Sequence, residues 1–431
     1  MVLKMRKMKD SGIEWIGEIP EGWEIVPVRS CFDEVRTKNT DGQEQNALQF
    51  KSGNIISKTN FNASMDDYVA DTITNYTVVL PDTVMINGLN LNYDFKSLRV
   101  ALVKEKGVIT SAYLAIFPDR KKISPQYATY LFKGYETKMA FHNMGAGIRK
   151  TLGYKEFKNQ PLLLPSKEEQ NKISAYLDSK CSHIDTMLFR TRSGIEEYKK
   201  LKQAVITEAV TKGVRSEREM KDSGVAWIGE IPAEWSKCHL KNISSEIGDG
   251  LHGTPNFDDN GDVFFINGNN LGGEYVEPRA DTKRINSEEF LKYTRPFFSN
   301  QTIMISLNGS YGKVSLYKNF PMLLGKSAGY ITLLPSIDCR YIKYYLSSTP
   351  SQIMMTLSLN GTTIPNLSLN TLRNFSIFLP VLCEQKEVAD YLDAKCAEID
   401  GLIAKKECLV KELESYKKSL IYEVVTGKRE V

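Results

Sequence analysis

The sequence lacks long apolar runs, paired cysteines and clustered histidines. No stretch approaches the roughly 20 apolar residues that a membrane span requires, and residues 1–10 (MVLKMRKMKD) contain no apolar signal segment. The seven cysteines form no C-x-x-C pair, and the chain has only four histidines. These absences argue against a membrane span and a cysteine- or histidine-based metal site, and they predict a soluble cytoplasmic protein with reduced cysteines.

The motifs of nucleotide-dependent enzymes are missing too. A phosphate-binding loop needs the spacing G-x-x-x-x-G-K-[ST], which GSYGKV at 309–314 and LLGKSAG at 323–329 both break. The Asn/Asp-Pro-Pro-aromatic motif of adenine methyltransferases is also missing. A nuclease site built from paired carboxylates is still an open alternative, with Asp249, Asp258 and Asp259 as candidates. We favour the interpretation that these residues lie in a solvated loop. We therefore expect no catalytic site, metal or cofactor in this chain.

Neither charge sign dominates. The chain has 56 basic and 52 acidic residues, for a formal net charge of +4. Any surface that binds phosphates must therefore arise from segregation of charge within the fold. The length of 431 residues, 42% of them hydrophobic, suits two or three globular domains.

Two kinds of segment occur twice. MKDSGIEWIGEIPEGW at residues 8–23 and MKDSGVAWIGEIPAEW at residues 220–235 share twelve of sixteen positions and contain all four tryptophans. We name these segments the first and second tag, and we expect their tryptophans to fix them to a domain surface. YLDSKCSHID at 176–185 returns as YLDAKCAEID at 391–400. The pattern predicts a tandem duplication with a period near 215 residues.

Each half ends in one long predicted helix, over residues 166–213 and 381–426. Ser166 and Glu169 have the spacing of a capping box, and Gly213 can form a left-handed C-terminal cap. Apolar residues follow a heptad in both helices, which predicts that they pair as an antiparallel coiled coil. The predicted seam consists of Leu177, Cys181, Ile184, Leu188, Ile195, Tyr198, Val205, Leu392, Cys396, Ile399, Ile403, Val410, Leu413 and Leu420.

Polar residues interrupt this seam, and apolar residues continue beyond it. Lys202 and Lys417 occupy the same a position, where a polar residue weakens pairing while fixing its register. The apolar stripe is also wider than a two-helix seam requires. Either a separate protein partner, which we favour, or the chain's own domains should cover its flanks, at Met187, Ile206, Val210, Leu402, Leu409, Ile421 and Val425.

Between tag and helix, each half contains short predicted strands separated by glycine- and asparagine-rich turns. The expected strands are 77–80, 100–103, 113–117, 263–266, 302–305 and 330–334, followed in each half by a helix (125–139 and 339–355) and a closing strand (161–165 and 376–380). We predict one α+β fold used twice with pseudo-two-fold symmetry. The predicted boundaries are 1–165, 166–213, 214–380 and 381–431.

The tags and helices repeat almost verbatim, whereas the domains share a pattern and few residues. Repeated tags and helices that flank two diverged domains suit a protein that recognises two different targets at a fixed separation. A helix of roughly 47 residues is about 70 Å long, which equals the length of about 20 base pairs of B-DNA.

These motifs resemble the specificity subunit of a type I restriction-modification enzyme over essentially the whole chain. They are IPEGW and IPAEW in the tags, the terminal YKKSLIYEVVTGK, and a Glu-Gln pair before YLD in each helix (Glu169, Gln170, Glu384 and Gln385). The second domain resembles target recognition domains in IGDGLHGTPNF, FFINGNNL and SLNGSYGKVSL, at 247–257, 264–271 and 306–316. The first domain has LQFKSGNI and MINGLNLNYDFKSLRVALV but no Asp-Gly-x-His-x-Thr-Pro stretch.

The resemblance implies a non-catalytic subunit that binds double-stranded DNA. Each target recognition domain would read one half of a bipartite site, and the coiled coil would set the spacer. Two methyltransferase subunits would dock on the helices and methylate adenine at N6 with S-adenosylmethionine, and restriction subunits using ATP and Mg²⁺ would join them. A helical scaffold that assembles proteins without reading DNA is the alternative.

Turn residues in both domains have side chains that can match base edges or bind phosphates. The same residue types also populate turns for conformational reasons, so any single contact is a weak prediction. The predicted contacts of the first domain are Lys51, Ser52, Asn54, Asn87, Asn90, Asn92, Tyr93, Lys96, Arg99, Arg149 and Lys150. Those of the second are His252, Thr254, Asn267, Asn269, Asn270, Asn308, Ser310, Tyr311, Lys313, Lys326, Thr362 and Thr363.

Overall fold

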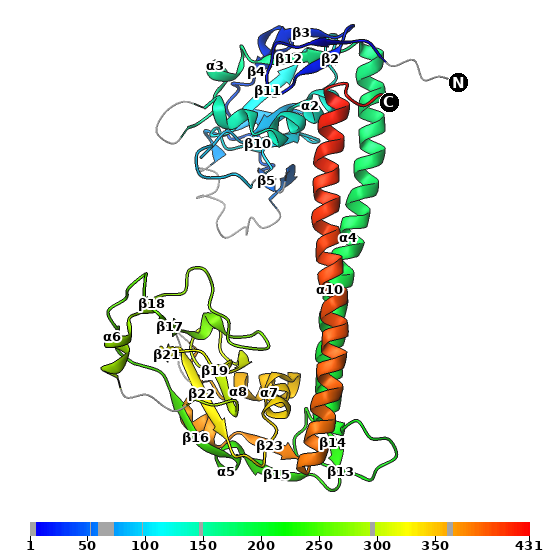
Figure 1. Ribbon diagram of the computed structural model, residues 1–431. Coiled ribbons are helices and arrows are strands. Elements are labelled where there is room, and N and C mark those ends of the chain that lie inside the picture. Colours follow the sequence, from blue (N-terminus) through cyan, green and yellow to red (C-terminus); the bar gives the residue numbers. More distant parts are fainter. Residues whose placement is uncertain are drawn as a thin grey trace. The chain divides into compact units, whose positions relative to one another are not determined.

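The computed structural model describes residues 6–51, 53–58, 73–96, 98–145, 150–293, 298–359 and 365–431. They form two compact units, each with its own α/β core (Figure 1). Unit 1 comprises residues 1–192 and 408–431, and unit 2 comprises residues 193–407. The division falls inside both long helices, so each helix contributes to both units. No helix among the described residues is long and apolar enough to cross a membrane.

Unit 1 contains short strands, small helices and parts of both long helices. Its strands are β1 (Met8–Asp10), β2 (Glu18–Pro20), β3 (Glu24–Pro27), β4 (Phe32–Glu34), β5 (Leu48–Lys51), β6 (Asn54–Ser57), β7 (Thr77–Val79), β8 (Val84–Ile86), β9 (Val100–Leu102), β10 (Gly107–Ile109), β11 (Leu114–Pro118) and β12 (Pro161–Leu164). Its helices are η1 (Val28–Ser30), α2 (Pro125–Thr137), η3 (Ala140–Asn143) and α3 (Tyr154–Phe157), followed by the long α4 (Lys167–Lys212).

Unit 2 repeats this order with additions. Its strands are β13 (Met220–Asp222), β14 (Glu230–Pro232), β15 (Ser236–His239), β16 (Ser244–Asp249), β17 (Val263–Ile266), β18 (Arg284–Ile285), β19 (Thr302–Ser306), β20 (Val314–Leu316), β21 (Met322–Leu324), β22 (Ala328–Leu333) and β23 (Ser376–Leu379). Its helices are α5 (Leu240–Ile243), η4 (Gly268–Asn270), α6 (Ser287–Leu291), α7 (Cys339–Ser347), α8 (Thr349–Leu357) and α9 (Leu369–Arg373), followed by the long α10 (Leu382–Val425).

Equivalent strands have the same neighbours in both units. The central antiparallel sheet has the order β4-β11-β8-β9 in unit 1 and β16-β22-β19-β20 in unit 2. The hairpins β1-β2 and β13-β14 form the tags, and β3 and β15 pair with the closing strands β12 and β23. In unit 2, β17 pairs in parallel with β21, and unit 1 has a parallel bridge between Ala47 and Val108.

The helix predicted over 339–355 is two helices, so that prediction is wrong. Ser348 interrupts it with an extended backbone (φ −70°, ψ 153°) and serves as both the C-cap of α7 and the N-cap of α8. Pro350 follows within the first turn of α8, where its missing N–H costs nothing. A proline inside one continuous helix would remove a backbone hydrogen bond and clash with the preceding turn.

The core of each unit lies between the central sheet and the long helices. In unit 1, apolar residues of β8, β11 and α2 pack with Leu177 and Ile184 of α4 and with Leu420 and Val424 of α10. In unit 2, β19, β22 and α7 pack in the same way on Ile206 and Leu392. The long helices are therefore part of both cores.

Both long helices have identifiable ends. Gly213 adopts a left-handed backbone (φ +74°) after α4, as predicted, and Gly427 (φ +70°) does so after α10. A Cβ on Gly213 would lie 2.4 Å from Nη1 of Arg218, so a larger residue there would also displace the arginine that binds Glu384. Only half of the predicted capping box forms. Ser166 Oγ accepts the Glu169 N–H at 3.3 Å, but the Glu169 carboxylate binds Trp23 and Arg6 instead of the helix backbone.

Ion pairs join the two helices within each unit. In unit 1, Lys417 Nζ lies 2.6 and 2.7 Å from the carboxylate oxygens of Asp185. In unit 2, Lys202 Nζ lies 2.8 and 2.6 Å from those of Asp400. The lysines that interrupt the predicted seam therefore each contact an aspartate of the other helix. Seam residues beside the domains are buried, whereas Tyr198, Val205, Ile403, Val410 and Leu413 are half-buried.

The chain's own domains cover more of the helix flanks than we expected. Ile206, Val210, Ile421 and Val425 are buried in the cores of their units. For these four, the interpretation as a surface for a separate partner is wrong. Met187 and Leu409 stay exposed, at 41% and 39%, and Leu402 is half-buried.

Candidate nucleic-acid interface

Three turns of unit 1 meet at one surface. The Leu91 N–H donates to the Lys150 carbonyl at 3.1 Å, which joins the β8–β9 connection to the segment after η3. A Cβ on Gly53 would lie 2.9 Å from that of Leu98, so the tip of the β5–β6 hairpin lies against the same connection. We name the exposed predicted contacts gathered there the first surface: Lys51, Asn54, Asn90, Tyr93, Lys96 and Lys150.

Arg99 does not belong to this surface, and its predicted DNA contact is wrong. The residue is 1% exposed, and its guanidinium donates to the carbonyls of Asn87 (2.9 Å) and Leu89 (2.8 Å). It also donates to the Asp94 carbonyl at 2.5 Å. Arginine has five donors in a fixed fork, so one side chain can hold several turns of backbone. Arg99 is therefore a buried residue that holds the backbone of the first surface in place.

Glu136 of α2 supports the same connection and should make stability depend on pH. Its carboxylate accepts the Arg99 backbone N–H, and burial raises the pKa of Glu136 from 4.5 to about 7. The folded state then binds this proton more tightly than the unfolded state does, so stability falls as pH rises from about 4.5 to about 7. We expect Glu136→Gln to flatten this fall in urea midpoints measured from pH 4 to 8. Parallel profiles for the two proteins would contradict the assignment.

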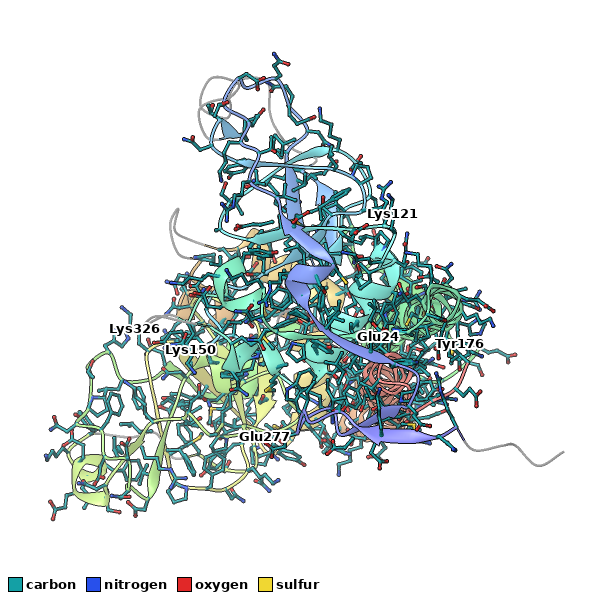
Figure 2. The ribbon with its side chains drawn as sticks, turned by 90° about the horizontal axis from the view of Figure 1, so that it is seen from above. Glu24, Lys121, Lys150, Tyr176, Glu277 and Lys326 are labelled. Carbon is teal, nitrogen blue, oxygen red and sulfur yellow. The ribbon has the colours of Figure 1, made fainter. Side chains whose placement is uncertain are left out.

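The turns of unit 2 gather at one surface too. Leu251 forms a parallel bridge with Gly325, and Asn308 forms an antiparallel bridge with Asn366. The Ser327 hydroxyl donates to Asn267 Oδ1 at 3.1 Å, which brings the turn after β17 to the same place. We name the exposed residues of these turns the second surface: His252, Thr254, Asn269, Ser310 and Lys326. Asn308, Tyr311 and Lys313 are half-buried beside them. Figure 2 labels Lys326, and Lys150 of the first surface.

Several predicted contacts instead hold the turns together. Asn267 accepts from Ser327, and Asn270 accepts the Asn267 N–H and donates to Thr282. Asn87 accepts the Leu89 N–H in unit 1, where Asn92 is half-buried. Polar groups engaged in this way are less available to base edges. Ser52, Arg149, Thr362 and Thr363 lie outside the described residues.

The three acids that the sequence left open as nuclease candidates lie in two separate places. Asp249 Oδ2 lies 2.7 Å from His252 Nε2, whereas Asp258 and Asp259 line a separate open cavity of about 540 Å³ with Glu289. No group of three or more potential metal ligands occurs among the described residues.

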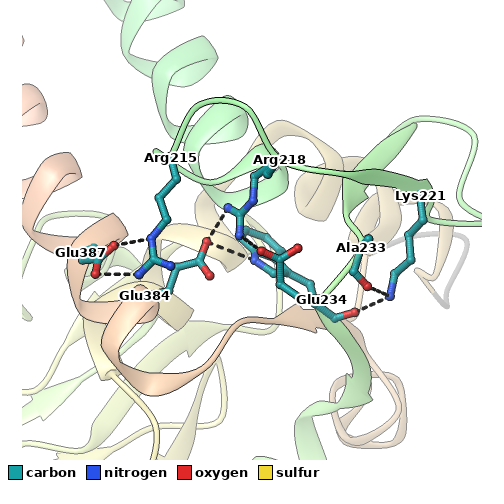
Figure 3. Close-up of polar contacts among 8 residues, drawn as sticks. Arg215, Arg218, Lys221, Ala233, Glu234, Glu384 and Glu387 are labelled. Atoms are coloured by element: carbon teal, nitrogen blue, oxygen red, sulfur yellow. Dashed lines mark hydrogen bonds and ion pairs between the residues drawn. The ribbon is translucent and has the colours of Figure 1, made fainter.

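The glutamates of the Glu-Gln pairs fix the tags to the long helices. In unit 2, Glu384 Oε1 accepts from Arg218 Nη1 at 2.5 Å and from Trp235 Nε1 at 3.2 Å (Figure 3). In unit 1, the Glu169 carboxylate accepts from Arg6 at 2.6 Å and from Trp23 Nε1 at 2.9 Å. Sequence reasoning missed both arginines, although they precede their tags at equivalent positions.

The glutamines fix the domains to the same helix ends. Gln170 accepts the Ser124 N–H at 2.7 Å and donates to the Pro165 carbonyl at 3.0 Å. Gln385 accepts the Asp338 N–H at 2.9 Å and donates to the Pro380 carbonyl at 2.9 Å. Each Glu-Gln pair therefore joins tag, domain and helix, which leaves the turn surfaces free to differ.

Comparisons with known proteins agree on one family. Residues 232–408 match the family described as "Type I restriction modification DNA specificity domain". The type I restriction enzyme MjaVIII specificity subunit of Methanocaldococcus jannaschii is 25% identical, over 99% of this chain and 98% of its own. The StySPI specificity subunit of Salmonella potsdam is 23% identical, over 95% of this chain and 90% of its own length.

A solved chain has the same fold. It comes from "Structural basis underlying complex assembly and conformational transition of the type I R-M system", with a TM-score of 0.70 and 16% identity, over 95% of this chain and 99% of that one. The family match over residues 232–408 and these relatives, which align with nearly the whole chain, make this chain similar to the specificity subunits of type I restriction-modification enzymes.

Proposed function

We propose that this chain reads DNA for a type I restriction-modification complex, with residues 1–165 and 214–380 as target recognition domains. Each domain would bind one half of a bipartite, asymmetric site in double-stranded DNA. One observation carries the proposal: two surfaces of different sequence lie at equivalent places in the repeated fold, and each contains asparagine, lysine and hydroxyl side chains. These groups match base edges and phosphates.

In this proposal the long helices form an antiparallel coiled coil that relates the halves by a pseudo-two-fold axis and sets the spacer. The reciprocal pairs Lys202–Asp400 and Lys417–Asp185 support it, because charged residues at seam positions fix the register of pairing. Helix α4 has 46 residues, which gives a length of about 70 Å.

Two methyltransferase subunits would dock along the exposed faces of the helices. Leu201 and Tyr416 occupy equivalent repeat positions and are 48% and 49% exposed, which supports two equivalent docking sites. S-adenosylmethionine would belong to these subunits, and ATP and Mg²⁺ to restriction subunits that join them. The assembly would act in the cytoplasm.

Mapping of methylated adenines tests this function. The chain is co-expressed with a candidate methyltransferase subunit, and N6-methyladenine is mapped across plasmid and genome by single-molecule sequencing. We expect one split motif with a fixed gap. Matched insertions in both helices, near Ser193 to Glu196 in α4, should change the gap and leave both half-sites unaltered. Altered half-sites would contradict the role of the helices as a ruler.

The scaffold alternative makes a different prediction. A DNA reader should bind even non-cognate DNA, with a logarithm of affinity that falls linearly with the logarithm of salt concentration. A stable, intact complex that neither binds DNA in this way nor methylates a split motif would favour the scaffold.

A further inference from the structure

The connection between β8 and β9 is an insertion relative to its counterpart. It spans residues 87–99, whereas the equivalent β19–β20 connection in unit 2 spans only residues 307–313. All of the longer connection except Ser97 is described. The additional length places apolar side chains at the first surface.

These side chains are exposed to an unusual degree for apolar groups. Tyr93 is 73% exposed, Phe95 57% and Leu98 48%. The Phe95 ring stacks on the His142 ring, with centroids 5.1 Å apart and planes at 11°. His142 Nε2 lies 3.1 Å from the Asp94 carbonyl oxygen, so η3 holds the connection in place. Exposed aromatic groups on a fixed backbone commonly mark a binding surface.

Hydrogen bonds from Arg99 hold the backbone that carries these rings. Arg99 binds backbone carbonyls on both sides of Tyr93, at Leu89 and Asp94. Because the backbone is already ordered, binding through Tyr93 loses little conformational entropy. An aromatic group on such a backbone can present its face to a flat partner.

The charges around Tyr93 favour DNA over a protein partner. Lys51, Lys96 and Lys150 are exposed on the same surface. The one acid of the connection, Asp94, is engaged within it: it accepts the Lys96 N–H at 3.1 Å and lies 3.6 Å from Arg99 Nη2. Lysines bind phosphates, and exposed aromatic or apolar side chains can insert between base steps of a duplex.

We propose that the Tyr93 ring inserts at a base step of the half-site read by unit 1 and stacks on a base that it partly unstacks, while the Phe95–His142 stack holds the connection in place. The inference rests on the proposed function and adds a contact from an exposed ring, whereas the tyrosine in the shorter connection of unit 2, Tyr311, is half-buried. Stacking of this kind is sequence-tolerant, so Tyr93 would contribute affinity for the half-site more than discrimination between bases.

The test uses the complex of the full chain with its methyltransferase subunits and a duplex that carries the mapped site. We expect Tyr93→Ala to weaken binding about tenfold, whereas Tyr93→Phe retains affinity because its ring still stacks. The salt dependence of binding should stay unchanged in Tyr93→Ala, but Lys96→Ala should reduce its slope by about one.

A second measurement identifies what Tyr93 touches. A photoreactive benzoylphenylalanine at position 93 should crosslink to bases of one half-site only. For the binding measurement, Leu80→Ala is the matched control of Tyr93→Ala. Leu80 is also exposed, at 48%, but it lies before β8 and outside the β8–β9 connection. Crosslinking to a methyltransferase subunit, or wild-type affinity in Tyr93→Ala, would overturn the inference while a split methylation motif still upheld the proposed function. Absence of any split motif would instead remove the proposed function itself.

Discussion

Glu384→Gln should destabilise unit 2 by about 3 kcal/mol. The Glu384 side chain is 2% exposed and that of its partner Arg218 10%, so the substitution leaves a poorly solvated positive charge whose remaining partner is Glu234, which is 55% exposed. An arginine side chain stays protonated even without a carboxylate partner, so Arg218 cannot relieve the loss by giving up its proton. Glutamine keeps the size and an acceptor for Trp235, and the variant therefore isolates the loss of charge.

Glu387→Gln is the matched control, on the same helix three residues later. Glu387 binds Arg215 in a bidentate pair at 2.7 and 2.8 Å (Figure 3), but both side chains are nearly half exposed. Exposed pairs contribute roughly 0–1 kcal/mol. Urea denaturation measures both variants, and hydrogen exchange should place the loss for Glu384→Gln at the second tag and the start of α10. Equal, small effects would refute the role of Glu384.

Arg99→Ala should cost at least about 3 kcal/mol in unit 1, because three backbone carbonyls lose a charged donor and a cavity opens beneath the β8–β9 connection. Hydrogen exchange at residues 88–95 should rise. Binding of the half-site read by unit 1 should weaken, while the half-site read by unit 2 stays unchanged.

Arg120→Ala is the control that tests whether the loss of any arginine in unit 1 destabilises the unit as Arg99→Ala should. Arg120 pairs with Asp82 at 2.6 Å and is 59% exposed, so its loss should cost less than about 1 kcal/mol. If Arg99→Ala left exchange at residues 88–95 at wild-type rates, Arg99 would not be what orders the connection.

The sequence alone determined the repeated parts of this protein. The heptads, the glycine cap at Gly213 and the verbatim tags are local or periodic signals, and each reflects a constraint that acts on neighbouring residues. The expectation that tryptophans fix the tags to the fold is confirmed at Trp23 and Trp235, which are 1% exposed, but not at Trp227, which is 44% exposed. Family motifs in tags and helices then indicated what kind of protein this is.

Only the tertiary structure decided the roles of single polar residues. Arg99 is a residue type that commonly contacts DNA and follows an asparagine-rich turn, yet it is buried, because its own connection folds around it so that three of its carbonyls accept from the guanidinium. Glu169 has capping-box spacing but turns to Trp23, 146 positions away. Such partners come together only through folding, so no local pattern encodes them. The sequence predicted which segments are duplicated, and the fold decided which turn residues stay available to a partner.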